Sequence, residues 1–134
     1  MGAVGAASRG LLIDTSALVA HFRGRAGIDR VVSQYVSAFV SAVTVYELEY
    51  GARRSGRASD LRAFEDAFGT DVIPVGRDEA ARAAEVNAAL AGQGKRIGDR
   101  DALIAATALV HHLDLLTLNT EEFRRVPGLR VLEP

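Results

Sequence analysis

Short apolar runs alternate with segments of helical spacing along this chain, and that alternation limits the folds it can adopt. The first run, residues 11–13, is bounded by Gly10 and Asp14 and suits a buried strand. Strands that alternate with helices favour a mostly parallel sheet covered on both faces. We therefore expect an α/β domain of three layers, α/β/α, around a roughly five-stranded sheet. The expected strands are residues 11–13, 38–40, 71–75, 115–118 and 129–132. The expected helices are 17–22, 28–35, one around Glu47, 58–68, 78–90 and 100–112.

The length and composition favour one globular domain. A chain of 134 residues is long enough for a core of its own, and we expect a flexible lead over residues 1–10 and a single domain over residues 11–134. The absence of cysteine excludes disulfides and thiolate metal sites. The formal net charge of -1 does not predict nucleic-acid binding, so any attraction for phosphate would come from local patches. No apolar run approaches the length of a membrane span, and we expect a cytoplasmic protein.

Four acidic or amide residues lie at or near places where an apolar run passes into a helix. They are Asp14, Glu47, Asp101 and Asn119. The carboxyl ends of the strands in an open α/β sheet meet at one edge, so these side chains are expected to share a cleft. Carboxylates gathered in one cleft repel each other unless a cation holds them. The sequence therefore predicts a divalent metal site at this edge.

Helix capping is the alternative explanation for the first two residues. Asp14 directly follows a strand and has the side chain of a common helix N-cap. Glu47 stands three residues after Thr44, the spacing of a capping box, in which the glutamate reaches back to the cap amide. Glu49 is the competing carboxylate, but it lies about 200° around the helix from Glu47, so both cannot face one cleft.

The third and fourth residues have competitors close by. Asp99 follows Gly98 and is expected to cap the next helix, which leaves Asp101 in the first turn to face the cleft. Asn119 follows a buried strand, where a turn or cap residue is common, yet its amide oxygen can bind a hard cation or position its water. Glu122 is the nearest further carboxylate.

Four segments, taken in order, resemble one known family. They are DTSALV from Asp14, ELEYGA from Glu47, DALIAATAL from Asp101 and TLNTEEFRRVPGLRV from Thr117. Together they are similar to the motifs of the PIN-domain family, and more narrowly to its VapC-type toxin ribonucleases. The resemblance runs from Leu11 to the C-terminus. It implies a three-layer α/β/α domain that cleaves RNA with Mg²⁺ or Mn²⁺, and a homodimer held inactive by a small VapB-like antitoxin.

The resemblance also implies roles for individual residues. Asp14 matches the first aspartate of the family, Glu47 the glutamate of its E-L-x-x-G segment, and Asp101 the aspartate that opens D-x-L-I-A-A. The fourth position is an acid or an amide in the family; Asn119 occupies it here, with Glu122 in the acidic position before phenylalanine. The hypothesis is that Asp14 and Asp101 hold the metal. Glu47 would be a third ligand or, with Asn119, hold its waters or a second ion.

RNA and an antitoxin would need surfaces of their own. The best phosphate contacts are the basic residues that flank the acidic segments, although solvated surface charge explains them equally well. They are Arg53, Arg54, Arg57, Lys95, Arg96 and Arg100. Apolar side chains on several helices would line a groove for an antitoxin helix or simply form core. They are Val19, Phe22, Tyr46, Tyr50, Leu61, Phe64 and Phe68.

Other functions are compatible with parts of this pattern. Related folds include metal-dependent DNA and flap nucleases, and Asn119 in place of an acid is consistent with a catalytically degenerate binding module. A phosphoryl-transfer receiver domain would require paired acids after the first strand and a lysine after the last, which this chain lacks.

Overall fold

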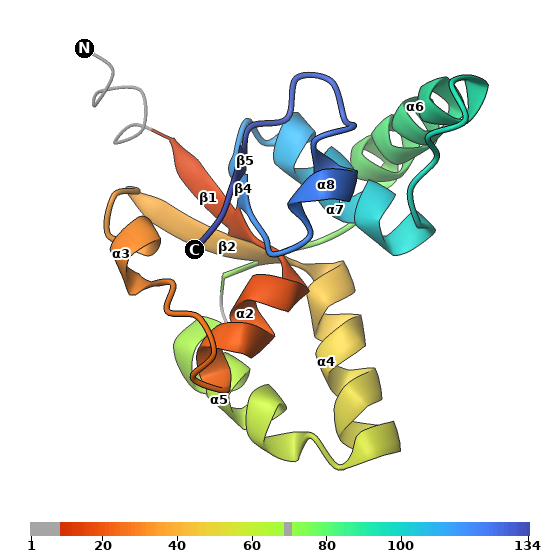
Figure 1. The fold of residues 1–134 in the computed structure, drawn as a ribbon. Coiled ribbons are helices and arrows are strands. Elements are labelled where there is room, and N and C mark those ends of the chain that lie inside the picture. The colour runs from red at the N-terminus through yellow and green to blue at the C-terminus, as the bar shows by residue number, and fades with distance from the viewer. Residues whose placement is uncertain (1–8, 69–70) are drawn as a thin grey trace.

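The structure is a computed structural model, and it describes residues 9–68 and 71–134 (Figure 1). The elements in chain order are β1 (Gly10–Ile13), α2 (Thr15–Phe22), α3 (Asp29–Val32), β2 (Ser37–Ser41), α4 (Ala42–Ser55), α5 (Ala58–Phe68), β3 (Val72–Ile73), α6 (Arg77–Gly92), α7 (Asp99–Val110), β4 (Asp114–Leu116), α8 (Thr120–Phe123) and β5 (Val131–Leu132). The predicted lead covers residues 1–10, of which residues 1–8 lie outside the described ranges and Gly10 opens β1.

Five parallel strands form one sheet in the order β3-β2-β1-β4-β5. The central strand β1 pairs with β2 through Leu11 and Ala38, and with β4 through Leu12 and Leu115. The chain moves outward from β1 to β2 and β3, then crosses to β4 on the other side. Such a reversal opens a crevice at the carboxyl ends of the strands, here beside the end of β1. The expectation of a parallel five-stranded sheet is confirmed.

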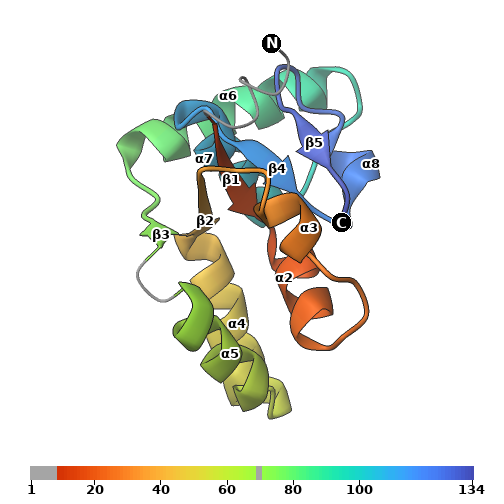
Figure 2. The ribbon, with the colours of Figure 1, turned by 90° about the vertical axis from the view of Figure 1, so that its left-hand side faces the viewer.

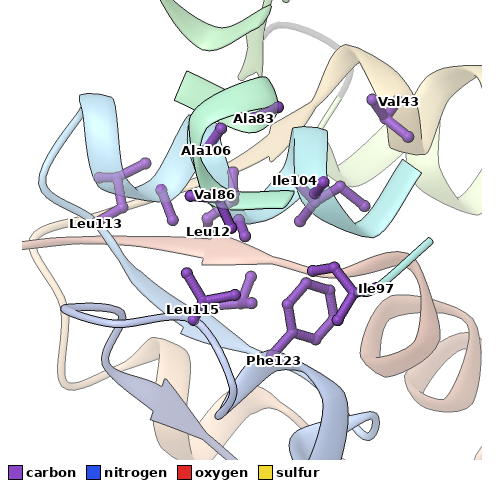
Figure 3. Packing of buried hydrophobic residues seen from close by; sticks show 14 of the residues in the cluster. Leu12, Val43, Ala83, Val86, Ile97, Ile104, Ala106, Leu113, Leu115 and Phe123 are labelled. Atoms are coloured by element: carbon purple, nitrogen blue, oxygen red, sulfur yellow. The ribbon is translucent and has the colours of Figure 1, made fainter. Parts of the chain in front are cut away.

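Alternate residues of the central strands point to opposite faces of the sheet and divide the core in two. Leu12 and Leu115 pack with α6 and α7, as Figure 3 shows for Leu12 beside Val86 and Ile104. Leu11 of β1 and Leu116 of β4 join the other cluster, which includes buried residues from α2, α4 and α5. Figure 2 shows these helices on the far side of the sheet from α6 and α7. The three-layer expectation is therefore confirmed.

Several predicted elements are shorter in the structure, and two of them have a clear local reason. The helix expected at 28–35 covers only Asp29–Val32, because the N–H groups of Gln34 and Tyr35 bond three residues back in tight turns. The strand expected at 71–75 stops at Ile73, before Pro74, on the edge strand β3. Proline has no N–H for a ladder, so the short edge strand follows from its position.

A buried aspartate joins the amino ends of the strands. Asp114, the first residue of β4, is fully buried and accepts hydrogen bonds from Tyr35 Oη (2.7 Å) and Arg9 Nη1 (3.1 Å). Arg130 Nε lies 3.6 Å from Oδ2 of the same carboxylate. Burial, followed by the bond to Asp114, raises the pKa of Tyr35 to about 12. A cavity of about 730 Å³ lies beside this cluster, at the edge of the sheet opposite the predicted cleft.

Candidate functional site

The four predicted site residues line one cavity at the carboxyl edge of the sheet. Asp14 directly follows β1, and Glu47 lies on α4. Asp101 lies in the first turn of α7, and Asn119 in the turn after β4. The cavity has a volume of about 550 Å³. Four segments distant in sequence therefore meet at the crevice that the strand order creates.

Hydroxyl groups hold the side chain of Asp14. The residue stands at the N-cap position of α2, but its side chain makes no capping hydrogen bond. Its Oδ2 instead accepts from Ser16 Oγ (2.7 Å) and from Thr117 Oγ1 (2.8 Å), and the residue is only 4% exposed. The capping explanation is therefore wrong for this carboxylate.

Glu47 is likewise not a capping residue. The helix α4 begins at Ala42, and the Oγ of Ser41 caps it by accepting from the N–H of Val43 (3.1 Å). Glu47 is thus the sixth helical residue, too far from the cap for a capping box, and that alternative is wrong. Its Oε1 accepts from Thr15 Oγ1 (2.7 Å), and Arg100 Nη1 lies 3.9 Å from Oε2. Glu49 points elsewhere and pairs with Arg53.

The pKa of the Asp101 carboxyl is raised in this site. It lies in the first turn of α7 and is half-buried. Burial is the main cause that raises the pKa of Asp101 to about 7, followed by the negative charges of Asp14, Glu122 and Glu47. The prediction that Asp99 caps α7 is wrong, because Gly98 occupies the cap position and Asp99 is the first helical residue. The Asp99 side chain is 81% exposed and pairs with Arg96.

Asn119 and Glu122 both stand beside Asp101. Asn119 Nδ2 donates to Asp101 Oδ2 at 3.5 Å, and its backbone N–H donates to Thr117 Oγ1 (2.9 Å). In this arrangement Asn119 orients the Asp101 carboxylate with its nitrogen, which cannot bind a cation. Glu122, in the first turn of α8, adds its charge to the surroundings of Asp101. Four carboxyl groups therefore gather around one crevice.

A family model described as the PIN domain matches residues 11–129, nearly the whole chain. The chain belongs to the PIN-domain family. Among curated PIN-domain relatives, a Ribonuclease VapC1 of Rickettsia felis is 36% identical over 128 residues, covering 92% of this chain and 95% of the relative. A tRNA(fMet)-specific endonuclease VapC of Shigella flexneri is 38% identical over 93 residues, covering 68% and 70%. A DNA-bound VapBC structure from Salmonella typhimurium superposes with a TM-score of 0.81 at 25% identity, covering 94% of this chain and 98% of that one.

The PIN-domain cleft contains residues that sequence reasoning did not assign to it. Thr15, Ser16 and Thr117 are among them: the Thr15 hydroxyl donates to Glu47, and the hydroxyls of Ser16 and Thr117 donate to Asp14. The signal was the placement of hydroxyl residues directly after two strands. Arg25 and Leu118 also line the cavity. Arg25 follows α2 in an irregular loop whose path no periodicity reveals.

The predicted basic residues distribute unequally around this PIN-domain cleft. Arg100 reaches Glu47, and with Arg57 it lines an adjoining hollow of about 210 Å³. Arg53 and Arg96 pair with surface carboxylates instead. Arg25 and Arg100 are therefore the arginines nearest the acidic cavity and its rim within the described ranges.

The donor set suits a hard divalent cation. The carboxylates of Asp14, Glu47 and Asp101 supply oxygen donors to the cavity, and within residues 9–68 and 71–134 neither Asp14 nor Asp101 forms an ion pair. No group of three or more histidine, aspartate or glutamate side chains in those ranges is arranged to hold a metal ion as it stands. Binding would therefore require the carboxylates to draw together around the ion, whose positive charge would offset their mutual repulsion.

The helices of the described ranges include none with the length and apolar character of a membrane span.

Proposed function

We propose that this protein is an endoribonuclease and the toxin of a toxin–antitoxin pair, and that its hydrolysis of RNA depends on Mg²⁺ or Mn²⁺. The observation that carries the proposal is the convergence of Asp14, Glu47 and Asp101 in one cavity of a PIN domain. Relatives that align with nearly the whole chain carry the name ribonuclease, which supports RNA over DNA as the substrate.

Asp14 and Asp101 are the proposed metal ligands, with Glu47 as the third. An ion bound there would lower the pKa of a coordinated water and offset charge on the phosphate. Other side chains of the protein orient these ligands. Thr117 and Ser16 orient Asp14, and Asn119 orients Asp101.

Substrate phosphates need positive charge at the rim of an acidic cavity. Arg25 lines the cavity and is exposed, and Arg100 stands 3.9 Å from Glu47 with a side chain 59% exposed. We assign phosphate contact to these two arginines. Their forked donors match phosphate oxygens, and both side chains are exposed to solvent.

A VapB-like antitoxin is the proposed protein partner. The structural relative from Salmonella typhimurium is a VapBC assembly bound to DNA, which supports such a partner here. Of the apolar residues predicted to line a groove, Phe64 is buried in the core, and Val19, Phe22, Leu61 and Phe68 pack against that core. Tyr46 and Tyr50 remain 54% and 52% exposed and stack on each other along α4. We assign antitoxin contact to this tyrosine pair; a homodimer stays a prediction.

The decisive experiment measures RNA cleavage by the purified protein with Mg²⁺, with Mn²⁺ and with a chelator. Because one relative is named for tRNA(fMet), that tRNA is the first substrate to test. Asp14→Asn and Asp101→Asn should reduce cleavage by at least about a thousandfold, since each removes a ligand charge. Asp99→Asn is the matched control, because Asp99 lies on the same helical turn as Asp101 but faces solvent. Cleavage that survives the chelator, or full activity of either site variant, would contradict the proposal.

A further inference from the structure

Leu118 exposes a large apolar side chain inside the acidic cavity. Four large apolar residues of the described ranges are markedly exposed, namely Val36, Tyr46, Tyr50 and Leu118. Of these, Leu118 lines the cavity that holds Asp14 and Asp101, and it is 49% exposed. Its place beside the candidate catalytic acids makes this apolar surface available to a ligand bound in the cavity.

The backbone on both sides of this side chain is fixed to the Asp14 network. The N–H of Leu118 donates to Ser16 Oγ (3.1 Å), which itself donates to Asp14 Oδ2 (2.7 Å). The next N–H, that of Asn119, donates to Thr117 Oγ1 (2.9 Å), which also donates to Asp14. The Leu118 side chain is therefore presented from a backbone held in place relative to the Asp14 carboxylate.

The residues that line the cavity divide into apolar and acidic ones. Val19 and Ala20 of α2, together with Ala26, join Leu118 in its lining, and Arg25 also lines it. Its volume of about 550 Å³ lies within the range of roughly 300–1,000 Å³ that is usual for small-molecule pockets. One nucleotide fits this division, because its phosphate is anionic and the faces of its base are apolar.

We propose that Leu118, with Val19 and Ala26, binds the nucleobase of a nucleotide adjoining the scissile phosphate. The inference rests on the proposed function and deepens it by placing the base as well as the phosphate. An unstacked base of single-stranded RNA covers its apolar face against protein side chains. The aliphatic wall offers no hydrogen bonds to the base edges, so the site selects by stacking area and favours purines over pyrimidines.

A double-mutant cycle between protein and RNA tests this contact. The probe is a fluorescent five-nucleotide oligoadenylate, and a set of matched probes has each position abasic in turn. Binding is measured by anisotropy with Ca²⁺ in place of Mg²⁺, so that the RNA is bound without being cut. At one position the abasic change should weaken wild-type binding about fivefold and leave Leu118→Ala binding unchanged. Leu118→Phe, which enlarges the stacking surface, should make the abasic loss larger.

Val36→Ala is the matched control, since Val36 is 71% exposed and does not line this cavity. It should show the same abasic loss as the wild type. Equal abasic losses in the wild type and in Leu118→Ala would overturn the base site and leave Leu118 as a contact for a protein partner.

Cleavage with Mg²⁺ is measured in parallel: a protein that cuts RNA without this coupling lacks only the base site. A protein that shows the coupling but never cuts retains the base site and loses the proposed hydrolysis, whereas a protein that cuts tRNA but binds no probe loses the base site alone.

Discussion

At the scale of single residues, the acids of the cleft differ in what surrounds them. Asp14 accepts hydrogen bonds from two neutral hydroxyls, which orient the carboxylate without cancelling its charge. Asp101 has Asp14, Glu122 and Glu47 near it and a single amide donor at 3.5 Å. Burial and this repulsion raise its pKa to about 7. Ionised Asp101 thus lowers the stability of the metal-free protein, and a bound cation would offset that loss of stability.

Asp101→Asn should therefore stabilise the metal-free protein in a pH-dependent way. The folded chain binds the proton of Asp101 more tightly than the unfolded chain does, because the pKa rises from 3.8 to about 7 on folding. The wild type accordingly loses stability as pH rises between those values, and the loss is constant above them. Asparagine has no such proton, so the advantage of the variant should grow from about pH 4 to about pH 7 and then level off. Urea unfolding in a chelating buffer across this range measures the difference in the free energy of unfolding.

The exposed neighbour Asp99 supplies the control for this experiment. Asp99→Asn removes the same charge from the same helical turn, outside the crowded cleft. It should not reproduce the pH-dependent advantage over the wild type. Adding Mg²⁺ should raise the stability of the wild type above about pH 7 and have little effect on Asp101→Asn. A stability difference that is flat with pH would contradict the account of Asp101.

At the scale of elements, the two edges of the sheet use buried aspartates in opposite ways. At the carboxyl edge Asp14 is held by hydroxyls and has no ion pair within the described residues. At the amino edge Asp114 is bound by Arg9, Arg130 and the hydroxyl of Tyr35, which neutralise and enclose it. This second cluster connects β4 with the residues just before β1, β2 and β5. The amino edge therefore holds the strands in register, and the carboxyl edge is left for chemistry.

Tyr35→Phe separates these two roles. The variant loses the 2.7 Å hydrogen bond to a buried carboxylate but keeps the ring, so the free energy of unfolding should fall by about 1.5–3 kcal/mol. Cleavage per folded molecule should stay at the wild-type level, because Tyr35 stands at the opposite edge of the sheet from the acidic cavity. Urea denaturation and a cleavage assay at matched folded concentration measure the two effects. Tyr46→Phe, which removes an exposed hydroxyl, is the control for the stability loss; a fall in cleavage for Tyr35→Phe would contradict the separation of the edges.

At the scale of the whole molecule, the order of the elements was predictable and their exact starting points were not. Apolar runs of three residues, such as Leu11–Ile13, indicate buried strands, and parallel pairing then brings the ends of these strands together. Ser41 and Thr44 are both hydroxyl residues that can cap α4, and only the end of β2 decides between them. Arg25 escaped prediction because an irregular loop carries it into the cavity. Local patterns thus specify the framework, whereas contacts between distant segments complete the site.

Control of a toxin by its partner also involves the molecule as a whole. We expect the antitoxin to bind at the exposed face of α4. Tyr46 and Tyr50 stand one helical turn apart with ring centroids 6.0 Å from each other, and both rings are about half exposed. Aromatic side chains of this kind are typical anchors of protein interfaces. The double variant Tyr46→Ser/Tyr50→Ser should therefore weaken antitoxin binding by at least about a hundredfold, the loss expected for two such anchors.

Co-expression of each variant with its VapB-like antitoxin measures this loss in cells. The wild type should be neutralised, whereas the double tyrosine variant should arrest growth because it cleaves RNA and escapes its inhibitor. Val36→Ser, at an exposed apolar position away from α4, should remain neutralised. Tyr50 also lines the hollow that reaches Glu47, so cleavage by the purified double variant must be measured alone. If that cleavage is intact and the antitoxin still neutralises the variant, the antitoxin binds another face and the tyrosine pair serves a different contact.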